Sequence, residues 1–353
     1  MKILIVRLSS IGDCVLASPV VEALQERYPA AHLTWAVQSK SLPVVRGLPG
    51  LADILLWNDH HRWRSLGSAL WRTWRERFDI VLDLQGLDKA GLFSIASGAK
   101  RRVSGTRARN IAHWSSNELV PEPEIIHARL VNLRRAAQVG IAEDAAERFY
   151  PRVPVTSTHR RAADEFLAQA GFLPTHRVVG LNLGAAHAFK RWPIERFAQL
   201  ANELLVSDGN TRLIIFGAPS DMPLLEEFET ELARCQPAPP GMSWPGRIVA
   251  AVGRIDLMQL ASIAERCSAF VTADTGPMHI AAAIGAPVVA LFGPTDSTHT
   301  GPVYKPGNAP IRVLDAREIV EDWPAPMDAL KVELVFDEVR ALMQQVEEMR
   351  SRA

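Results

Sequence analysis

Cysteine, long apolar runs and an excess of charge of either sign are all scarce in this chain of 353 residues. The three cysteines are too few and too widely spaced for a disulfide framework or a Cys-x-x-Cys zinc site, which indicates a reducing, cytoplasmic location. Lys and Arg together number 39, and so do Asp and Glu, so the chain lacks the basic excess of a dedicated nucleic-acid-binding protein. We therefore expect a globular protein without a nucleic-acid partner.

The sequence also has no apolar run close to the ~20 residues that span a bilayer. Its apolar start is interrupted at Arg7, which is too early for a signal peptide. We expect a protein that is soluble or bound only at a membrane surface.

Several motifs of nucleotide and metal chemistry are missing as well. No two glycines are separated by a single residue, which excludes the Gly-x-Gly-x-x-Gly fingerprint of nicotinamide and flavin enzymes. Walker A, His-Glu-x-x-His, Gly-x-Ser-x-Gly and Asp-x-Asp sequences are absent too. These absences argue against a dehydrogenase, and they favour a ligand site built from plainer helix amino ends.

What the sequence does contain is a regular alternation of strand-length apolar runs with segments of helical period. This alternation predicts an α/β protein with parallel sheets, and the length favours two domains. A Pro- and Ser-containing stretch around 150–157 suggests domains over residues 1–155 and 156–328. The last helical segment, about 329–353, could cap the second domain or cross back to the first. The predicted strands are Ile3 to Leu8, Leu33 to Val37, Ile54 to Trp57, Ile80 to Leu84, Arg102 to Gly105, Val178 to Asn182, Leu213 to Phe216, Ile248 to Val252, Ala269 to Thr272 and Val288 to Phe292.

The turn Ser9-Ser10-Ile11-Gly12-Asp13 lies between the first predicted strand and helix, where an open α/β sheet presents its ligand crevice. Gly12 allows close approach of a ligand, and the helix dipole favours the ionised form of Asp13, which could accept a proton. An ordinary helix-capping aspartate is the alternative.

Two segments of the second half could bind a diphosphate. One is the loop from Asn182 to Pro193, which contains Gly184 and a Lys190-Arg191 pair. The other is Asp274-Thr275-Gly276-Pro277-Met278-His279, which follows a strand and opens a helix whose N–H groups could hold an anion. A solvated basic loop and a structural helix cap are the respective alternatives.

An acidic acceptor could be held by Asp83-Leu84-Gln85-Gly86-Leu87-Asp88-Lys89 together with the basic run Lys100-Arg101-Arg102, unless these form a solvated charged face. A further helix carries Trp63, Trp71 and Trp74. Trp63, Leu70 and Trp74 are near helical spacing, so we expect this helix to pack against the domain, with a membrane-interface face as the alternative.

The segments 9–13, 83–89, 190–193 and 274–279 together resemble glycosyltransferase family 9, the ADP-heptose:lipopolysaccharide heptosyltransferases, in family order and over nearly the whole length. The Gln-Gly-Leu-x-Lys element is most similar to that of heptosyltransferase I. The resemblance implies a GT-B fold of two Rossmann-like domains across a cleft, with the C-terminal helix returning to the first domain. It also implies that the protein has no cofactor and no metal site of its own.

It also implies an inverting transfer of L-glycero-D-manno-heptose from ADP-heptose to Kdo of the lipopolysaccharide inner core (Kdo₂-lipid A), at the cytoplasmic face of the inner membrane. Asp13 resembles the catalytic base and Lys190 the lysine on the donor phosphates. We expect the protein to act as a monomer. The expected donor-binding residues are Gly184, Lys190, Asp221, Asp274, Thr275, Gly276 and His279, and the expected acceptor-binding residues are Ser10, Gly12, Gln85, Lys89, Arg101 and Arg102.

Two other functions remain open. A family 9 transferase could use another acceptor, such as a later core heptose, a protein or a secondary metabolite. A non-catalytic nucleotide-sugar-binding module would keep the same donor residues, but its role would not depend on Asp13.

Overall fold

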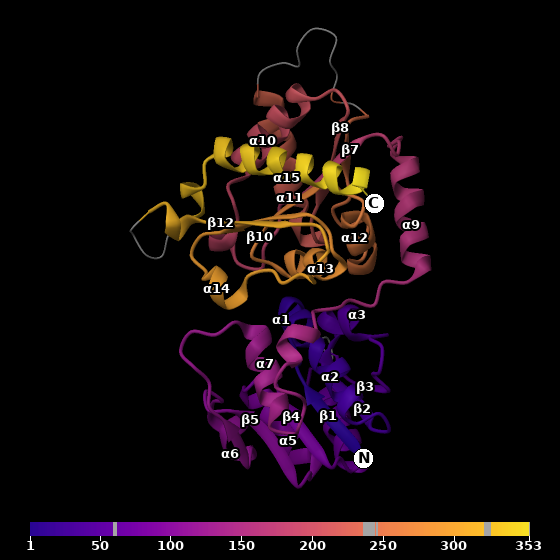
Figure 1. Ribbon diagram of the computed structural model, residues 1–353, viewed down its shortest axis with the longest axis vertical. Helices are drawn as coiled ribbons and strands as arrows, with labels where there is room; N and C mark the ends of the chain where they lie inside the picture. The colour runs from indigo at the N-terminus through magenta and orange to yellow at the C-terminus, as the bar shows by residue number, and fades with distance from the viewer. Residues whose placement is uncertain (59–61, 236–243, 245, 321–325, 353) are drawn as a thin grey trace. The chain divides into compact units, whose positions relative to one another are not determined.

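The computed structural model describes residues 1–58, 62–235, 244, 246–320 and 326–352. The chain forms two compact units, Met1–Pro154 and Val155–Ala353, and each is built on its own six-stranded parallel sheet (Figure 1). The α/β class with two parallel sheets is thereby confirmed. No helix among the described residues is long and apolar enough to cross a membrane.

The first unit has the strand order β3-β2-β1-β4-β5-β6. Its strands are β1 Lys2–Val6, β2 His32–Gln38, β3 Asp53–Trp57, β4 Ile80–Asp83, β5 Arg101–Gly105 and β6 Glu118–Val120. Its helices are α1 Ile11–Ala17, α2 Pro19–Arg27, α3 Leu42–Val45, α4 Arg62–Glu76, α5 Asp88–Ser97, α6 Asn110–Ser115, α7 Ala128–Ala137 and α8 Ala145–Arg148, with a 3-10 turn at Ser39–Ser41.

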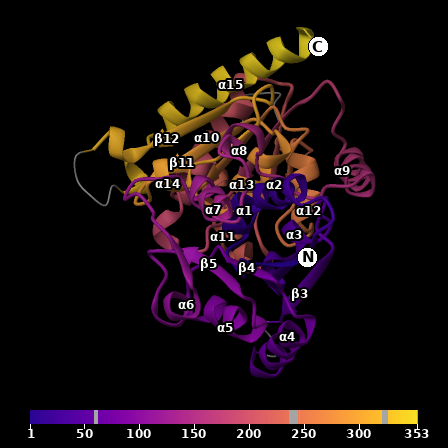
Figure 2. The same cartoon turned by 60° about the horizontal axis from the view of Figure 1, so that its bottom comes forward.

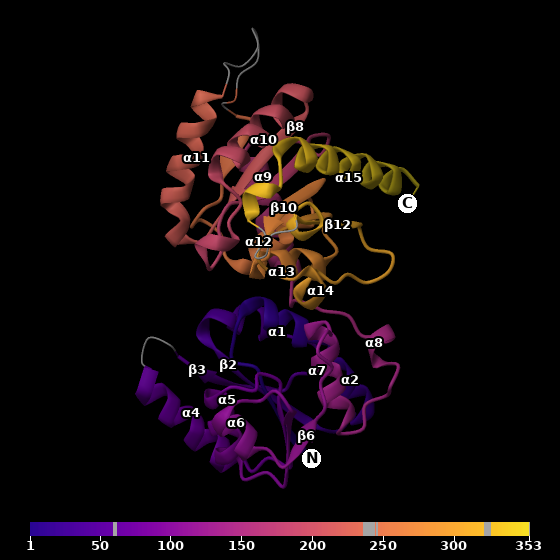
Figure 3. The same ribbon diagram turned by 90° about the vertical axis from the view of Figure 1, so that its left-hand side faces the viewer.

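Both faces of this sheet are covered, which explains why its central strands are apolar throughout rather than alternating. Helices α4, α5 and α6 contact one another on one face, and α1 and α2 contact α7 on the other (Figure 3). All strands are parallel, so their carboxyl ends, and the loops that follow them, lie at one edge of the sheet.

The second unit repeats this plan with the strand order β12-β11-β10-β7-β8-β9. Its strands are β7 Arg177–Asn182, β8 Thr211–Phe216, β9 Ile248–Ala250, β10 Ala269–Ala273, β11 Val288–Phe292 and β12 Ile311–Asp315. Its helices are α9 Ser157–Gln169, α10 Ile194–Ser207, α11 Met222–Arg234, α12 Leu257–Ala264, α13 Gly276–Ile284, α14 Ser297–Thr300 and α15 Val332–Arg352, with 3-10 turns at Ala188–Lys190, Pro219–Asp221, Ala316–Glu318 and Met327–Ala329.

Helix α10 contacts α11 and α15, whereas α12 contacts α9 and α13. Gly180 in β7 makes the sheet interior compact, because a Cβ there would come within 2.7 Å of the Phe270 ring. Phe270 and Phe216 pack edge to face across this position, with ring centroids 5.3 Å apart.

The structure contains each strand predicted from the sequence, but it also has two that were not predicted, β6 and β12. The single first helix expected from the sequence is divided at Ser18, because Pro19 begins α2. Helix α15 contacts α10, β10, β11 and β12 and so packs on the second unit, whereas the resemblance had grouped it with the first. The domain boundaries themselves stay a prediction.

Candidate functional site

At the carboxyl edge of the first sheet, Asp13 is the third residue of α1 and lies in its first turn. Its Oδ2 accepts bonds from the backbone N–H of Ser10, at 3.1 Å, and from the Ser10 hydroxyl, at 2.9 Å. Gly12 lies buried between them in the first turn. The Asp13 side chain is 33% exposed, so a carboxylate held in a fixed orientation remains accessible to a ligand.

Arg7, which directly follows β1, forms an ion pair with Asp13. Its Nη2 lies 2.5 Å from Asp13 Oδ1, and its Nη1 donates to the carbonyl of Leu84, which follows β4. Arg7 was not predicted as a site residue from the sequence, although it is the one charged residue inside the apolar run that starts after Lys2. The guanidinium therefore connects the candidate base to the neighbouring strand.

Gln85 lies at the same edge, as expected, but its amide oxygen accepts from the backbone N–H of Leu8 at 2.8 Å. Behind it, Asp83 Oδ1 accepts from the N–H groups of Gln85 and Gly86, both at 2.8 Å. Burial raises the pKa of Asp83, and these two bonds and the charge of Arg135 oppose that rise. The buried carboxyl thus shapes the turn, with Gly86 at a φ of +70°.

The other candidate acceptor residues are not brought together. Lys89 is in the first turn of α5, near the expected edge, with Nζ 5.0 Å from the centroid of the Trp57 ring. Arg101 and Arg102 begin β5 and lie at the opposite, amino edge of the sheet. We had grouped them with Gln85 because the two segments are close in sequence. Gln85, however, follows the carboxyl end of β4, whereas the two arginines are at the amino end of the parallel strand β5.

Their side chains are also engaged in the fold. Arg101 forms a two-pronged pair with Glu118, at 2.7 and 2.8 Å. Arg102 donates to the carbonyls of Ser115 and Ala99, both at 2.6 Å. These two arginines therefore hold β5 against the segments around it.

In the second unit, the loops after β7 and β10 meet in an ion pair. Lys190 Nζ lies 2.6 Å from Asp274 Oδ2, and the two side chains are 21% and 9% exposed. The two loops follow adjacent strands, so the pair sits at the carboxyl edge of the second sheet. The structure thus brings together two residues that are far apart in the sequence, as the resemblance implied.

The amino end of α13 lies beside this pair. Thr275 is the N-cap and Gly276 the first helical residue, but the Thr275 side chain does not cap the helix. Its hydroxyl lies 3.1 Å from the hydroxyl of Thr272. The N–H groups of the first turn are therefore left available for an anion. His279 lies one turn further along α13 and is buried.

Asp221, an expected donor-binding residue, ends the 3-10 turn that follows β8. It is buried, and its Oδ2 accepts from the backbone N–H of Ala218 at 2.8 Å. The same oxygen lies against Gly184, where a Cβ would come within 2.1 Å of it. Asp221 therefore closes its own turn and packs the loop after β8 against the loop after β7. Gly184 serves this close approach.

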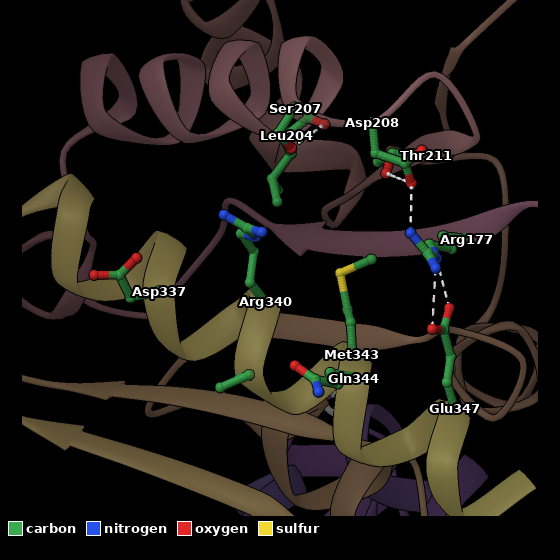
Figure 4. Close-up of a pocket in the computed structure, with 11 residues that line it drawn as sticks. Arg177, Leu204, Ser207, Asp208, Thr211, Asp337, Arg340, Met343, Gln344 and Glu347 are labelled. Carbon is green, nitrogen blue, oxygen red and sulfur yellow. Dashed lines mark hydrogen bonds and ion pairs between the residues drawn. The ribbon is translucent and has the colours of Figure 1, made fainter.

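A pocket of about 480 Å³ lies elsewhere in this unit, between α10, α15 and the amino ends of β7 and β8 (Figure 4). Arg177 lines it, paired with Glu347 at 2.5 Å and with Asp208 at 3.2 Å. None of the candidate donor residues lines this pocket. Among the described residues there is also no group of three or more His, Cys, Asp or Glu side chains that could hold a metal ion.

Comparison with known proteins shows the family to which the chain belongs. Residues 67–313 match the model of glycosyltransferase family 9 (heptosyltransferase). The chain is 25% identical to the lipopolysaccharide core heptosyltransferase OpsX of Haemophilus influenzae, over 84% of this chain and 80% of that one. It is 26% identical to lipopolysaccharide heptosyltransferase 2 of Escherichia coli, over 98% and 100%.

The solved structure of the E. coli heptosyltransferase WaaC with ADP has the same fold, with a TM-score of 0.73, 20% identity and coverage of 97% of this chain and 100% of that one. The family match covers well over half of the chain. The protein therefore belongs to glycosyltransferase family 9, the heptosyltransferases, and is a transferase of the GT-B fold class.

Proposed function

We propose that this protein transfers L-glycero-D-manno-heptose from ADP-heptose to Kdo of the lipopolysaccharide inner core, with inversion at the anomeric carbon. The observation that carries the proposal is the Lys190–Asp274 pair beside the uncapped amino end of α13. It is supported by the names of the relatives, which include a lipopolysaccharide core heptosyltransferase and a heptosyltransferase with bound ADP. The acceptor places the reaction at the cytoplasmic face of the inner membrane.

On the donor side, Lys190 and the N–H groups at Thr275 and Gly276 would bind the diphosphate of ADP-heptose. Negative charge builds up on the diphosphate as its bond to the anomeric carbon breaks. A cation and a helix amino end stabilise that charge more strongly in the transition state than in the substrate. Asp274 holds the lysine in place through the 2.6 Å contact.

On the acceptor side, Asp13 would act as the general base. It takes the proton of the Kdo hydroxyl while that oxygen forms the new bond to the anomeric carbon, and ADP leaves with the bonding electrons. Ser10 and Arg7 fix the orientation of the carboxylate. A base held in one geometry lowers the barrier because its proton-accepting oxygen need not be reoriented during reaction.

A later core heptose is the second candidate acceptor. It is favoured by the 26% identity to lipopolysaccharide heptosyltransferase 2 over 98% of the chain. Both candidates use the same donor site and the same base, so only the acceptor separates them.

The test is ADP release from ADP-heptose by the purified protein, with de-acylated Kdo₂-lipid A, with the same acceptor carrying one heptose, and with neither. We expect release only with the first acceptor, and we expect Asp13→Asn to lower kcat about 100-fold or more while donor affinity is kept. Asp144→Asn, at an exposed N-cap of the same unit, is the matched control. Release only with the heptose-bearing acceptor would replace the proposed acceptor, and release that does not depend on Asp13 would refute its role as base.

A further inference from the structure

The outer surface of α4, α5 and α6 exposes large apolar side chains that the fold does not use. Trp71 and Trp74 of α4 are 53% and 56% exposed, Ile95 of α5 is 59% exposed and Trp114 of α6 is 85% exposed. The three helices lie side by side over one face of the first sheet (Figures 2 and 3). We name the surface formed by Trp71, Trp74, Arg75, Arg77, Ile95 and Trp114 the tryptophan–arginine face.

Helix α4 packs against the sheet through its opposite face. Leu66, Ala69 and Thr73 are buried against the sheet, and Leu66 and Ala69 belong to its apolar core. Trp71 and Trp74 are one turn apart on the opposite stripe. This differs from our expectation that Trp74 would pack against the domain. The Trp63 side chain lies outside what the structure describes.

The charge around these tryptophans has one dominant sign. Residues 62–77 contain five arginines and one acidic residue, Glu76, although the whole chain has a net charge of +0. Glu76 is itself engaged by Lys2, with Nζ 2.8 Å from its Oε2.

Two of the arginines lie over the exposed rings. The guanidinium of Arg75 is 5.2 Å from the Trp71 ring centroid, and that of Arg77 is 5.9 Å from the Trp74 centroid. No acidic side chain in the described ranges forms an ion pair with either of them. Exposed tryptophans with arginines stacked on them are chemically complementary to the surface of an anionic bilayer. There the indole rings can insert at the depth of the headgroups, and the guanidinium groups can bind lipid phosphates.

We propose that the tryptophan–arginine face docks the protein on an anionic lipid bilayer. The inference rests on the proposed function in one respect, because an acceptor carried by a lipid gives the enzyme a reason to dock. In a parallel α/β unit the helices run antiparallel to the strands, so α4 and α5 begin at the carboxyl edge where Asp13 and Gln85 lie. The exposed side chains lie in the later turns of α4, α5 and α6, towards the amino edge of the sheet. The docking face therefore belongs to the same unit as Asp13 and Gln85, but it lies away from the edge that carries them.

The experiment is co-sedimentation of the full chain with vesicles of equal parts phosphatidylglycerol and phosphatidylcholine, and with vesicles of phosphatidylcholine alone. We expect binding to the anionic vesicles that weakens with salt. Arg75→Glu combined with Arg77→Glu, and separately Trp71→Ala combined with Trp74→Ala, should each reduce that binding about tenfold or more. Arg161→Glu and Leu173→Ser, at exposed positions of the second unit, are the matched controls and should bind as the wild type does.

Two further measurements separate the possible results. All variants should keep the thermal stability of the wild type and its activity on the de-acylated, water-soluble acceptor, because the altered side chains are exposed and lie outside the candidate site. Inactivity of the wild type on every soluble acceptor would refute the proposed function while leaving vesicle binding to be judged independently. Vesicle binding that is absent, or unchanged in both double variants, would overturn the docking face. A dimer that dissociates in the tryptophan variant without lipid binding would also overturn it, in favour of self-association.

Discussion

Lys190 Nζ and Asp274 Oδ2 are 2.6 Å apart, and this contact joins the loop after β7 to the loop after β10. The Asp274 side chain is only 9% exposed, so its charge is poorly solvated by water and depends on the lysine. The lysine in turn is held beside the amino end of α13. The pair therefore has two roles, one in stability and one in the proposed binding of the donor.

Replacing Lys190 should affect both roles. We expect Lys190→Ala to lower kcat/KM for ADP-heptose about 100-fold, because one cation at the leaving group is lost. We also expect a loss of about 1–3 kcal/mol of unfolding free energy, because the Asp274 carboxylate is left without its partner. Steady-state kinetics measure the first quantity and urea unfolding the second, and calorimetric titration with ADP measures donor binding directly.

The exposed Lys331→Ala is the control for the loss of a lysine. The double variant with Asp274→Ala should be less destabilised than the sum of the single variants, because neither charge is then left alone. Unchanged ADP affinity in Lys190→Ala would contradict the donor role and leave a purely structural pair.

Arg7 should act as a positioning residue for Asp13. In Arg7→Met the carboxylate loses its 2.5 Å partner, and we expect kcat to fall about 10- to 100-fold while ADP-heptose affinity stays the same. Arg7→Lys should recover part of the loss, because its ammonium can reach one partner but cannot bridge Asp13 and the Leu84 carbonyl together. A thermal melt accompanies the kinetics. A fall in kcat that tracks a fall in stability, without recovery by lysine, would indicate a structural role alone.

Gly184 and Asp221 should be coupled through close packing. A Cβ at position 184 would lie 2.1 Å from Asp221 Oδ2, so Gly184→Ala should lower the unfolding free energy by about 1–3 kcal/mol. Asp221→Ala removes that oxygen, and the double variant should lose less than the two single losses added together. Gly209→Ala, whose Cβ would meet no atom within 4 Å, should stay close to the wild type. Additive losses in urea unfolding would show that the two loops do not press on each other.

The sequence predicted the strands with clear apolar runs, but it missed one edge strand of each sheet. β6 has three residues and precedes Pro121, and β12 is partly exposed with Arg312 at its second position. An edge strand is covered less than a central one, so its apolar pattern is weaker. Pro19 is itself a signal for a helix boundary, but the helical spacing of apolar residues continues past it, so the sequence predicted one helix where the structure has α1 and α2.

For the candidate site, the sequence showed which turn each residue belongs to. It could not show the direction in which the side chain points. Asp13 and Thr275 were placed at helix amino ends because turn and helix signals adjoin there. Arg101 was misplaced, and the local contact of Asp221 was not predicted, for a different reason. Their partners, Glu118 and the backbone of Ala218, become visible only once the chain has folded.

The buried carboxyl of Asp83 should make stability depend on pH. Burial raises its pKa in the folded protein above the value of about 3.9 expected for the unfolded chain, so the folded state binds more protons between these two values. Its contribution to the unfolding free energy therefore falls as the pH rises from about 4 towards the folded pKa, and then levels off. Asp83→Asn cannot ionise, yet its amide oxygen can still accept from Gln85 and Gly86. We expect the variant to gain stability relative to the wild type across this window in urea unfolding at a series of pH values. A difference between the two proteins that does not change with pH would show that Asp83 is ionised to the same degree in the folded and unfolded chains.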